Sequence, residues 1–344
     1  MPAQGRAHRL IRRTAVSKKI WRVGMVGAGG ISSMHLEGIA RHPDRLQVVA
    51  ATDPDPQALA ETADKYDIPR RYERLDQMLA DGDVDVAVVC TPTHIRSDVV
   101  VPLLEAGIPV FCEKPLAETF AEAKVIAGAS SRTGTPAAVD QNFRRCFTFA
   151  AAKEVLAAGE IGRPLHWIQS AVGLRRDRGW RLTRDRYVMA IMSIHWLDGY
   201  RYLFGEEPLI VYCRGVNSPA VEGKPDTGVS LILEFPSGVV VNLSESFSSF
   251  AGGSRATLDC EKGALALDYQ TLTVIDADGG RREIANPFDF EGAAVHLLLD
   301  LCDAVETGRQ PETAVADNLN SIRIMEAAYR SLASGKPVNI EDVQ

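Results

Sequence analysis

The stretch from Trp21 to Asp53 places the strongest constraint on how this chain folds. An apolar segment at its start predicts a buried strand, and the turn Gly27-Ala28-Gly29 leads from that strand into a helix that begins near Ile31. A second apolar segment, residues 47–52, predicts another strand, and Asp53 stands at its end. Strand, glycine turn, helix, strand and terminal acid in this order are typical of a dinucleotide-binding unit.

The glycine turn has the features of a pyrophosphate site. Gly27 allows the tight turn, Gly29 lacks the Cβ that would block the phosphates, and the amides at the start of the helix attract the anion. Ser32 replaces the third glycine of the usual pattern and is still small enough for close packing of helix on strand. A similar turn also occurs without any ligand, so the flanking strands and Asp53 are what support the prediction.

The acid after the second strand favours NAD over NADP. A carboxylate at this position accepts hydrogen bonds from both ribose hydroxyls of the adenosine and repels a 2′-phosphate. Pro54, Asp55 and Pro56 follow Asp53, so the chain offers no arginine at the place where the phosphate of NADP is usually bound. We therefore expect NAD as the cofactor, with NADP less favoured.

Composition excludes several classes of protein. The chain has 344 residues, room for two domains, and its net charge of −7 argues against binding to nucleic acid or to a membrane surface. No apolar run is long enough to span a membrane. The six cysteines show no CxxC spacing, so we expect reduced core thiols in a cytoplasmic protein and no metal site. Residues 1–19 are basic and lack the apolar region of a secretory signal, which predicts a disordered tail.

Beyond Asp53, predicted strands and helices alternate. Helices are expected at residues 57–66 and 96–106, and strands at residues 84–90 and 109–112. This alternation indicates a parallel sheet with helices on both faces, and the loops at the carboxyl ends of its strands form the ligand crevice. These loops are expected to be Thr91-Pro92-Thr93-His94, Glu113-Lys114-Pro115 and Gln141-Asn142-Phe143-Arg144-Arg145. The predicted cofactor-binding residues are Gly27, Ala28, Gly29, Gly30, Ile31, Asp53, Thr91, Pro92, His94, Glu113 and Lys114.

The second half of the chain predicts a different kind of sheet. Residues 227–235 and 239–246 flank the turn Pro236-Ser237-Gly238 and are expected to form a hairpin. Further short strands are expected at residues 256–260, 264–268 and 271–276. A helix at residues 147–158 covers only part of such a sheet, so pairing of the open face with another subunit is expected.

Several segments together resemble the Gfo/Idh/MocA family of oxidoreductases. They are GAGGIS, the strand that ends at Asp53, CTPTHIRSDVVVPLLEAGIPVFCEKPLAET and the closing TGRQPETAVADNLNSIRIMEAAYRSLASGKPVNI. The resemblance implies an α/β protein with an N-terminal Rossmann domain and a C-terminal α/β domain that has a large, mostly antiparallel open sheet. It implies a Rossmann domain at residues 20–141 and a substrate and oligomerisation domain at residues 142–344, whose last helices return toward the Rossmann domain. A homodimer or homotetramer formed through the C-terminal sheet is expected.

The resemblance also implies two catalytic residues, Lys114 and His195. The lysine contacts the reacting oxygen, where a cation stabilises a developing alkoxide, and the histidine acts as general acid and base. Pro115 restricts Lys114 to an extended backbone that aims its side chain at the crevice, although a solvated lysine paired with Glu113 is the plainer alternative. His195 lies in residues 187–204, which predict one long helix, and a lone histidine there is more often a core residue.

The sequence departs from the family pattern one helical turn before His195. Many members carry an aspartate there, whereas this chain has Ile191, and Ser193 stands where a glycine is common. Tyr187 or Asp198 is a candidate for the missing contact. Asp198 is placed either to orient the imidazole or to pair with Arg201, three residues further on.

Residues 175–186, RRDRGWRLTRDR, contain six arginines and two aspartates. Beside a crevice this run favours a substrate with a carboxylate or phosphate, and the alternative is an exposed loop or a subunit contact. Arg96 and Arg145 add positive charge near the crevice, and Trp180 and Trp196 are candidates either to stack on a sugar or to join the core. The predicted substrate-binding residues are Lys114, Arg145, Trp180, Tyr187 and His195.

Three functions are consistent with these residues. The first is an NAD(P)-dependent dehydrogenase that acts on a secondary alcohol of a sugar, cyclitol or sugar-acid derivative. The second is a redox-neutral enzyme with tightly bound NAD, in which transient oxidation permits elimination or epimerisation. The third is a non-catalytic NAD-binding protein, which Ile191 in place of the aspartate suggests.

Overall fold

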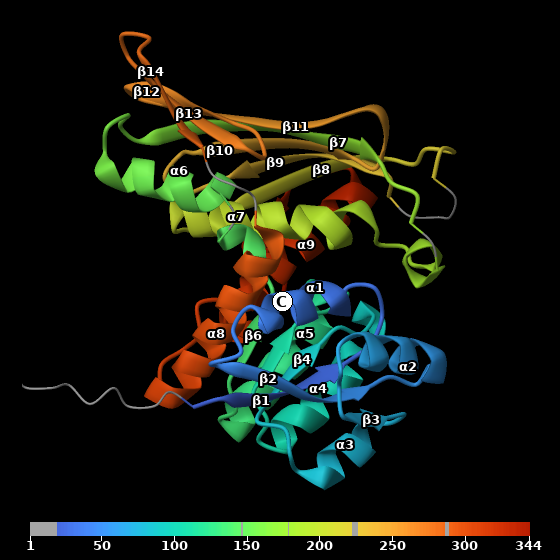
Figure 1. The fold of residues 1–344 in the computed structure, drawn as a ribbon. Coiled ribbons are helices and arrows are strands. Elements are labelled where there is room, and N and C mark those ends of the chain that lie inside the picture. The colour runs from blue at the N-terminus through green and yellow to red at the C-terminus, as the bar shows by residue number, and fades with distance from the viewer. Residues whose placement is uncertain (1–18, 146, 178, 222–225, 286–288) are drawn as a thin grey trace, which may run out of the picture.

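The computed structural model describes residues 19–145, 147–177, 179–221, 226–285 and 289–344. The described residues form two sheets, one of six strands and one of nine. Figure 1 shows the first sheet and its helices in the lower half of the molecule and the second sheet across the top, with a helical layer between them. The predicted tail at residues 1–19 lies, but for Lys19, outside the described residues, as does Cys146.

The first sheet is parallel throughout, as the alternation of strands and helices predicts. Its strand order is β3-β2-β1-β4-β5-β6, so the chain runs outward from β1 in both directions. The strands are β1 (Trp21–Val26), β2 (Leu46–Thr52), β3 (Arg70–Tyr72), β4 (Val86–Val89), β5 (Val110–Cys112) and β6 (Ala137–Val139). The edge strand β3 has three polar residues and no apolar run, and sequence analysis did not predict it.

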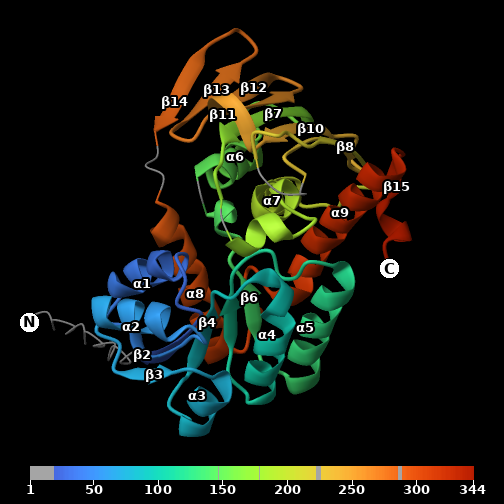
Figure 2. The same ribbon diagram turned by 90° about the vertical axis from the view of Figure 1, so that its right-hand side faces the viewer.

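Helices from both ends of the chain cover this sheet. The helices within its connections are α1 (Ser32–Ala40), α2 (Pro56–Lys65), α3 (Leu75–Asp81), α4 (Arg96–Glu105) and α5 (Phe120–Thr133). The C-terminal helix α8 (Phe290–Thr307) packs against α1, and α9 (Val315–Ser334) packs against α5 and also against β8 of the second sheet. The last helices therefore connect the two halves of the molecule, as Figure 2 shows from the side.

The second sheet is antiparallel except where β7 and β10 pair in parallel. Its order is β14-β13-β12-β11-β7-β10-β9-β8-β15, and the predicted hairpin is present as β9 and β10. The strands are β7 (Pro164–Leu174), β8 (Ile210–Val216), β9 (Gly228–Glu234), β10 (Val240–Ser246), β11 (Ser248–Cys260), β12 (Gly263–Leu267), β13 (Thr271–Asp276), β14 (Arg281–Ala285) and β15 (Val338–Asn339).

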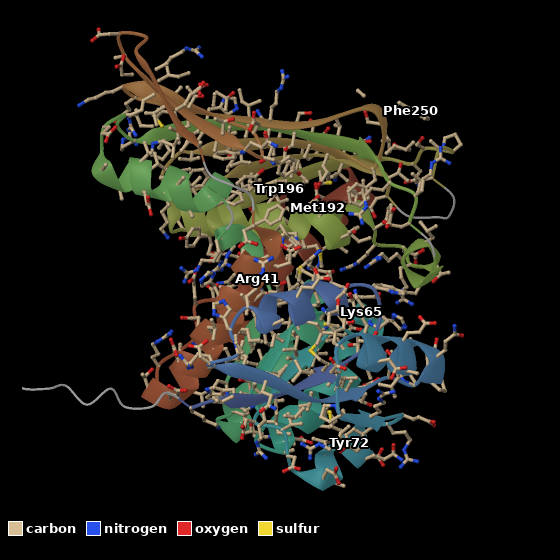
Figure 3. All side chains as sticks on the ribbon, viewed as in Figure 1. Arg41, Lys65, Tyr72, Met192, Trp196 and Phe250 are labelled. Atoms are coloured by element: carbon tan, nitrogen blue, oxygen red, sulfur yellow. The ribbon has the colours of Figure 1, made fainter. Side chains whose placement is uncertain are left out.

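The two faces of the second sheet differ in what covers them. Helices α6 (Phe147–Ala158) and α7 (Ile194–Phe204) lie on the inner face, between the sheets (Figures 1 and 2). Along β7 the side chains alternate, with Trp167 buried toward the helices and Ile168 46% exposed on the other face. The outer face carries no helix among the described residues, and Figure 3 shows Phe250, which is 79% exposed, on β11.

The expected helix at residues 187–204 is present from Val188 to Phe204, but it is not regular throughout. Residues Met189–Ser193 form a π-helical turn, and the regular helix α7 begins only at Ile194. The carboxylate of Asp226 accepts hydrogen bonds from the backbone amides of Tyr187 and Met189, with N to O distances of 2.8 and 3.3 Å. A side chain distant in sequence thus caps the chain at this point, so Tyr187 lies before the helix.

No helix in the described part of the chain is long and apolar enough to cross a membrane. The five described cysteines are all buried and free, in agreement with the expectation of core thiols.

Candidate active site

The glycine turn leaves open space where a pyrophosphate is expected. Gly27 has φ of +97°, and a Cβ there would lie 3.0 Å from the carbonyl carbon of Cys90, so only glycine suits the position. A Cβ added at Gly29 or Gly30 would meet nothing within 4 Å. The turn therefore fits a dinucleotide, whose phosphates would face the backbone amides at the start of α1.

Asp53 lies directly beside this turn. Its Oδ2 accepts a hydrogen bond from the amide of Ala28 at 2.7 Å, and its Oδ1 accepts one from the amide of Asp55 at 2.8 Å. The carboxylate is therefore fixed at the carboxyl end of β2, where the adenosine ribose of a dinucleotide is expected.

Arg96 joins the loops that follow β4 and β5. It is buried, with 2% exposure, and its guanidinium donates to the carbonyl oxygens of Thr91, Glu113 and Pro115; the distance to Thr91 is 2.6 Å. Burial lowers the pKa of Arg96. Arg96 is therefore a buried charge beside the crevice loops, and its guanidinium fixes the loop that carries Lys114 instead of being free to bind a ligand.

Lys114 extends from the end of β5 toward the helical layer. Its Nζ donates a hydrogen bond to the backbone carbonyl of Ile191, in the π-helical turn, at 2.8 Å. Burial, together with the positive charges of Arg175 and Arg181, lowers the pKa of Lys114. The Lys114–Pro115 peptide bond is cis. The plainer alternative, a solvated lysine paired with Glu113, is not what the structure shows.

Glu113 instead faces His35 of α1. The His35 Nε2 lies 2.9 Å from Glu113 Oε1 and 4.0 Å from Asp140 Oδ2, and all three side chains are buried. Burial opposes a charged imidazole, but contacts with Cys90 and Glu113 raise the pKa of His35 well above its ordinary value. Burial raises the pKa of Asp140 to about 7.

Among the described residues, His35, Glu113 and Asp140 are the one group of side chains spaced closely enough to hold a metal ion. The spacing of the cysteines in the sequence predicts no metal site. The two nearest ligand atoms, on His35 and Glu113, face each other at hydrogen-bonding distance, so we interpret the group as a buried ion pair behind Lys114.

His195 lies in the first turn of α7 and is 1% exposed. Its ring stacks on Phe143 with 4.2 Å between centroids and 13° between planes. Burial and the charge of Lys114 lower the pKa of His195 well below its ordinary value, so the imidazole is neutral at neutral pH. Its Nδ1 has no hydrogen-bond partner among the described residues, and Figure 3 shows the neighbouring Trp196 in the layer between the sheets.

Asp198 does not orient this imidazole. Its carboxylate accepts hydrogen bonds from Arg144 at 2.7 and 2.8 Å and from Ser321 at 2.7 Å, and it pairs with Arg201 at 3.4 Å. Of the two roles considered for Asp198, the structure shows the pairing with Arg201, within a larger buried network that anchors α7 to α9.

The predicted substrate-binding residues have different surroundings. The hydroxyl of Tyr187 donates to Asp177 at 2.7 Å. Arg145, in the loop after β6, pairs with Glu312. Trp196 is a core residue whose Nε1 donates to Glu245 at 3.1 Å. Trp180 contacts the ring of His94 with 5.8 Å between centroids. The structure thus brings Trp180, but not Trp196, beside the loop that follows β4.

Two buried side-chain amides lie in a predicted crevice loop, although the sequence did not single them out as site residues. Gln141 and Asn142 are 1% and 0% exposed, and neither side-chain amide has a hydrogen-bond partner among the described residues. Buried polar groups are rarely left unpaired, so these amides are candidates to bind a ligand. Their position directly after a buried strand is the signal that would have selected them.

The glycine turn, the acid after β2 and the lysine after β5 define a dinucleotide-binding oxidoreductase. A family model described as an oxidoreductase family with an NAD-binding Rossmann fold matches residues 21–141, and a model of the GFO/IDH/MocA C-terminal domain matches residues 149–266. The chain belongs to the Gfo/Idh/MocA family of NAD-binding oxidoreductases.

Characterised relatives match over nearly the whole chain. D-apiose dehydrogenase of Paraburkholderia graminis is 26% identical over 98% of this chain and 94% of its own length. Inositol 2-dehydrogenase of Rhizobium meliloti is 27% identical over 93% of this chain and 99% of its own length. An oxidoreductase from Agrobacterium radiobacter, solved in complex with NAD+, L-tartaric acid and magnesium, superposes with a TM-score of 0.88 at 22% identity, covering 95% of this chain and 100% of that one. This last likeness concerns the fold.

Proposed function

We propose that this protein transfers a hydride between the nicotinamide of NAD and a secondary alcohol of a sugar or cyclitol. The observation that supports this most directly is the meeting of Lys114 and His195 at the crevice, close enough for the lysine charge to affect the histidine. Bound NAD would supply the hydride acceptor. The relatives named for apiose and inositol act on compounds of this class.

The two side chains suit complementary roles in alcohol oxidation. The neutral imidazole of His195 accepts the hydroxyl proton as the hydride leaves the carbon. The ammonium of Lys114 stabilises the negative charge that develops on the oxygen. In the reverse direction, the protonated imidazole returns the proton to the oxygen, so the two roles balance in both directions.

The carbonyl of Ile191 takes the place of a side-chain partner for Lys114. In the family pattern an aspartate often stands at this position, whereas here the π-helical turn presents a backbone oxygen 2.8 Å from Nζ. π-Helical turns recur at functional sites because they present backbone groups that a regular helix would use internally. Lys114 is thereby held by an uncharged group, while the nearby carboxylates of Glu113 and Asp140 act to raise its pKa.

NAD is the proposed cofactor, rather than NADP. The carboxylate of Asp53 is fixed against the amide of Ala28, at the end of β2, where it would meet the ribose hydroxyls. A 2′-phosphate at that position would be repelled by Asp53 and by Asp55, whose amide Asp53 holds.

The outer face of the second sheet is the proposed contact between subunits in a homodimer or homotetramer. Ile168 on β7, Ile232 on β9 and Val216 on β8 are 46%, 39% and 63% exposed on it. Apolar side chains on an uncovered sheet face are typical of subunit contacts. Buried, reduced cysteines are consistent with a cytoplasmic protein.

The test is NADH formation by the purified protein on a panel of sugars, inositols, aldonates and uronates. Lys114→Met and His195→Ala are each expected to lower kcat by about 100-fold or more while NAD still binds. Full activity in either variant would contradict the assigned roles. Substrate conversion without net NADH, with NAD retained by the protein, would identify the redox-neutral alternative instead.

A further inference from the structure

The arginine run at residues 175–186 separates into structural and unpaired members. Arg184 binds the carboxylate of Glu118, with 2.8 Å between Nε and Oε1. Arg186 pairs with Glu326 at 2.9 Å. These two arginines attach the segment to the loop before α5 and to α9, and their charges are neutralised. Because both partners lie outside the run, this part of it is structural and holds the segment in place.

Arg175 and Arg181 are different. Among the described residues, no carboxylate lies within 4.0 Å of the Arg181 guanidinium, which instead lies over the ring of Trp180 at 5.4 Å. Arg175 pairs with Asp177 at 3.2 Å, but the same carboxylate also accepts a hydrogen bond from Tyr187 at 2.7 Å. The Asp177 carboxylate is thus shared between the guanidinium of Arg175 and the hydroxyl of Tyr187.

The segment that carries these arginines borders the crevice. Trp180 contacts His94, which follows β4, and Tyr187 leads into the π-helical turn whose Ile191 carbonyl holds Lys114. Consistent with this placement, the charges of Arg175 and Arg181 both contribute to lowering the pKa of Lys114. The positive charges of the two guanidinium groups and of the catalytic lysine therefore act on the same part of the crevice.

The carboxyl groups near these cations are shared with other partners. Lys114, Arg175 and Arg181 are cationic, and Asp177 is the carboxylate that pairs with one of them. Glu113 and Asp140, which both act to raise the pKa of Lys114, also face His35, and burial raises the pKa of Glu245 to about 8. Cations gathered at a partly buried site whose counter-charges are shared in this way favour an anionic ligand.

We propose that the crevice selects sugar or cyclitol derivatives that carry an anionic group, a carboxylate or a phosphate, and that Arg181 and Arg175 bind this group. Guanidinium groups match both anions through paired N–H donors. The ring of Trp180, positioned by His94, would lie against the apolar face of the same ligand. This inference rests on the proposed function and specifies its substrate class.

The test compares neutral sugars and inositols with the matching uronates, aldonates and sugar phosphates. Equilibrium binding to the protein–NADH complex is followed by NADH fluorescence, and kcat/KM is measured in parallel. An anionic member is expected to bind at least about tenfold more tightly than its neutral counterpart, and Arg181→Gln or Arg175→Gln is expected to remove most of this preference. Comparison of the uronates and aldonates with the sugar phosphates shows whether a carboxylate or a phosphate is preferred.

Arg132→Gln is the matched control, because Arg132 is exposed and its ion pair with Glu105 joins the C-terminal ends of α5 and α4. Equal binding of neutral and anionic compounds, or unchanged preference in Arg181→Gln, would overturn the inference. Anion binding that depends on Arg181 in a protein that forms no NADH would instead contradict the proposed function alone. The Lys114→Met variant separates the anion preference from the proposed function, since this variant is expected to lose turnover and keep anion binding.

Discussion

The ammonium of Lys114 donates a hydrogen bond to the backbone carbonyl of Ile191, with 2.8 Å between the two atoms. This contact explains how the site can be complete without an aspartate one turn before His195. A carbonyl holds the lysine side chain in position as a carboxylate would, but it adds no negative charge to raise the lysine pKa. The altered residue changes the electrostatics of the site while the position of Lys114 is kept.

Introducing the missing carboxylate is expected to shift the pH dependence of activity. In Ile191→Asp, a negative charge beside Lys114 raises the lysine pKa, so the ammonium persists to higher pH. Activity that falls as Lys114 loses its proton is therefore expected to fall about one pH unit higher than in the wild type. The measurement is kcat/KM against pH, and Ile191→Asn, which adds polarity without charge, is expected to leave the alkaline limb in place.

Removing the Arg96 guanidinium is expected to affect both stability and turnover. Arg96→Met leaves the carbonyls of Thr91, Glu113 and Pro115 buried without their donor, at a cost of about 2–4 kcal/mol in the free energy of unfolding. The loop carrying Lys114 loses its support, so kcat is expected to fall about tenfold. Chemical denaturation and steady-state kinetics test this, and a variant as stable and active as the wild type would refute the role.

Neutralising Asp53 is expected to relax the preference for NAD. Asp53→Asn keeps an oxygen to accept from the amide of Ala28 but removes the charge that repels a 2′-phosphate. The ratio of kcat/KM for NADP to that for NAD is expected to rise about tenfold. Asp53→Ala, which also loses the acceptor, is expected to weaken both cofactors. An unchanged ratio in Asp53→Asn would mean that the carboxylate does not contact the ribose.

Glu245 is expected to make stability depend on pH. Burial raises the pKa of its carboxyl from an ordinary 4.5 to about 8, so the folded protein keeps a proton that the unfolded chain releases. Stability is therefore lost as pH rises from about 4.5 toward 8, by about 4 kcal/mol near the upper end. Glu245→Gln does not ionise and still has groups to bond Ser193 and Trp196. Its Tm relative to the wild type should rise from pH 5 to pH 8; a constant difference would contradict the shifted pKa.

The elements that sequence analysis predicted correctly are encoded locally. The glycine turn and Asp53 lie within one βαβ unit, and the hairpin of β9 and β10 is specified by two apolar runs around a three-residue turn. Their signals are backbone freedom, periodicity and turn chemistry, all of which act over a few residues. The π-helical turn before α7 was not predicted, and Asp226, whose carboxylate caps the chain there, is distant in sequence.

The sequence by itself determined the cofactor domain and its parallel sheet, and it selected Lys114 and His195 as candidate catalytic residues. Only the tertiary structure decided which groups each functional side chain contacts. Asp198 binds Arg144, from a different element, and Arg96 binds three carbonyl oxygens rather than a ligand. The partner of Lys114 is the clearest case, because a backbone carbonyl is the same in every residue. No pattern of side chains encodes it, and only the path of the folded chain places it beside the ammonium.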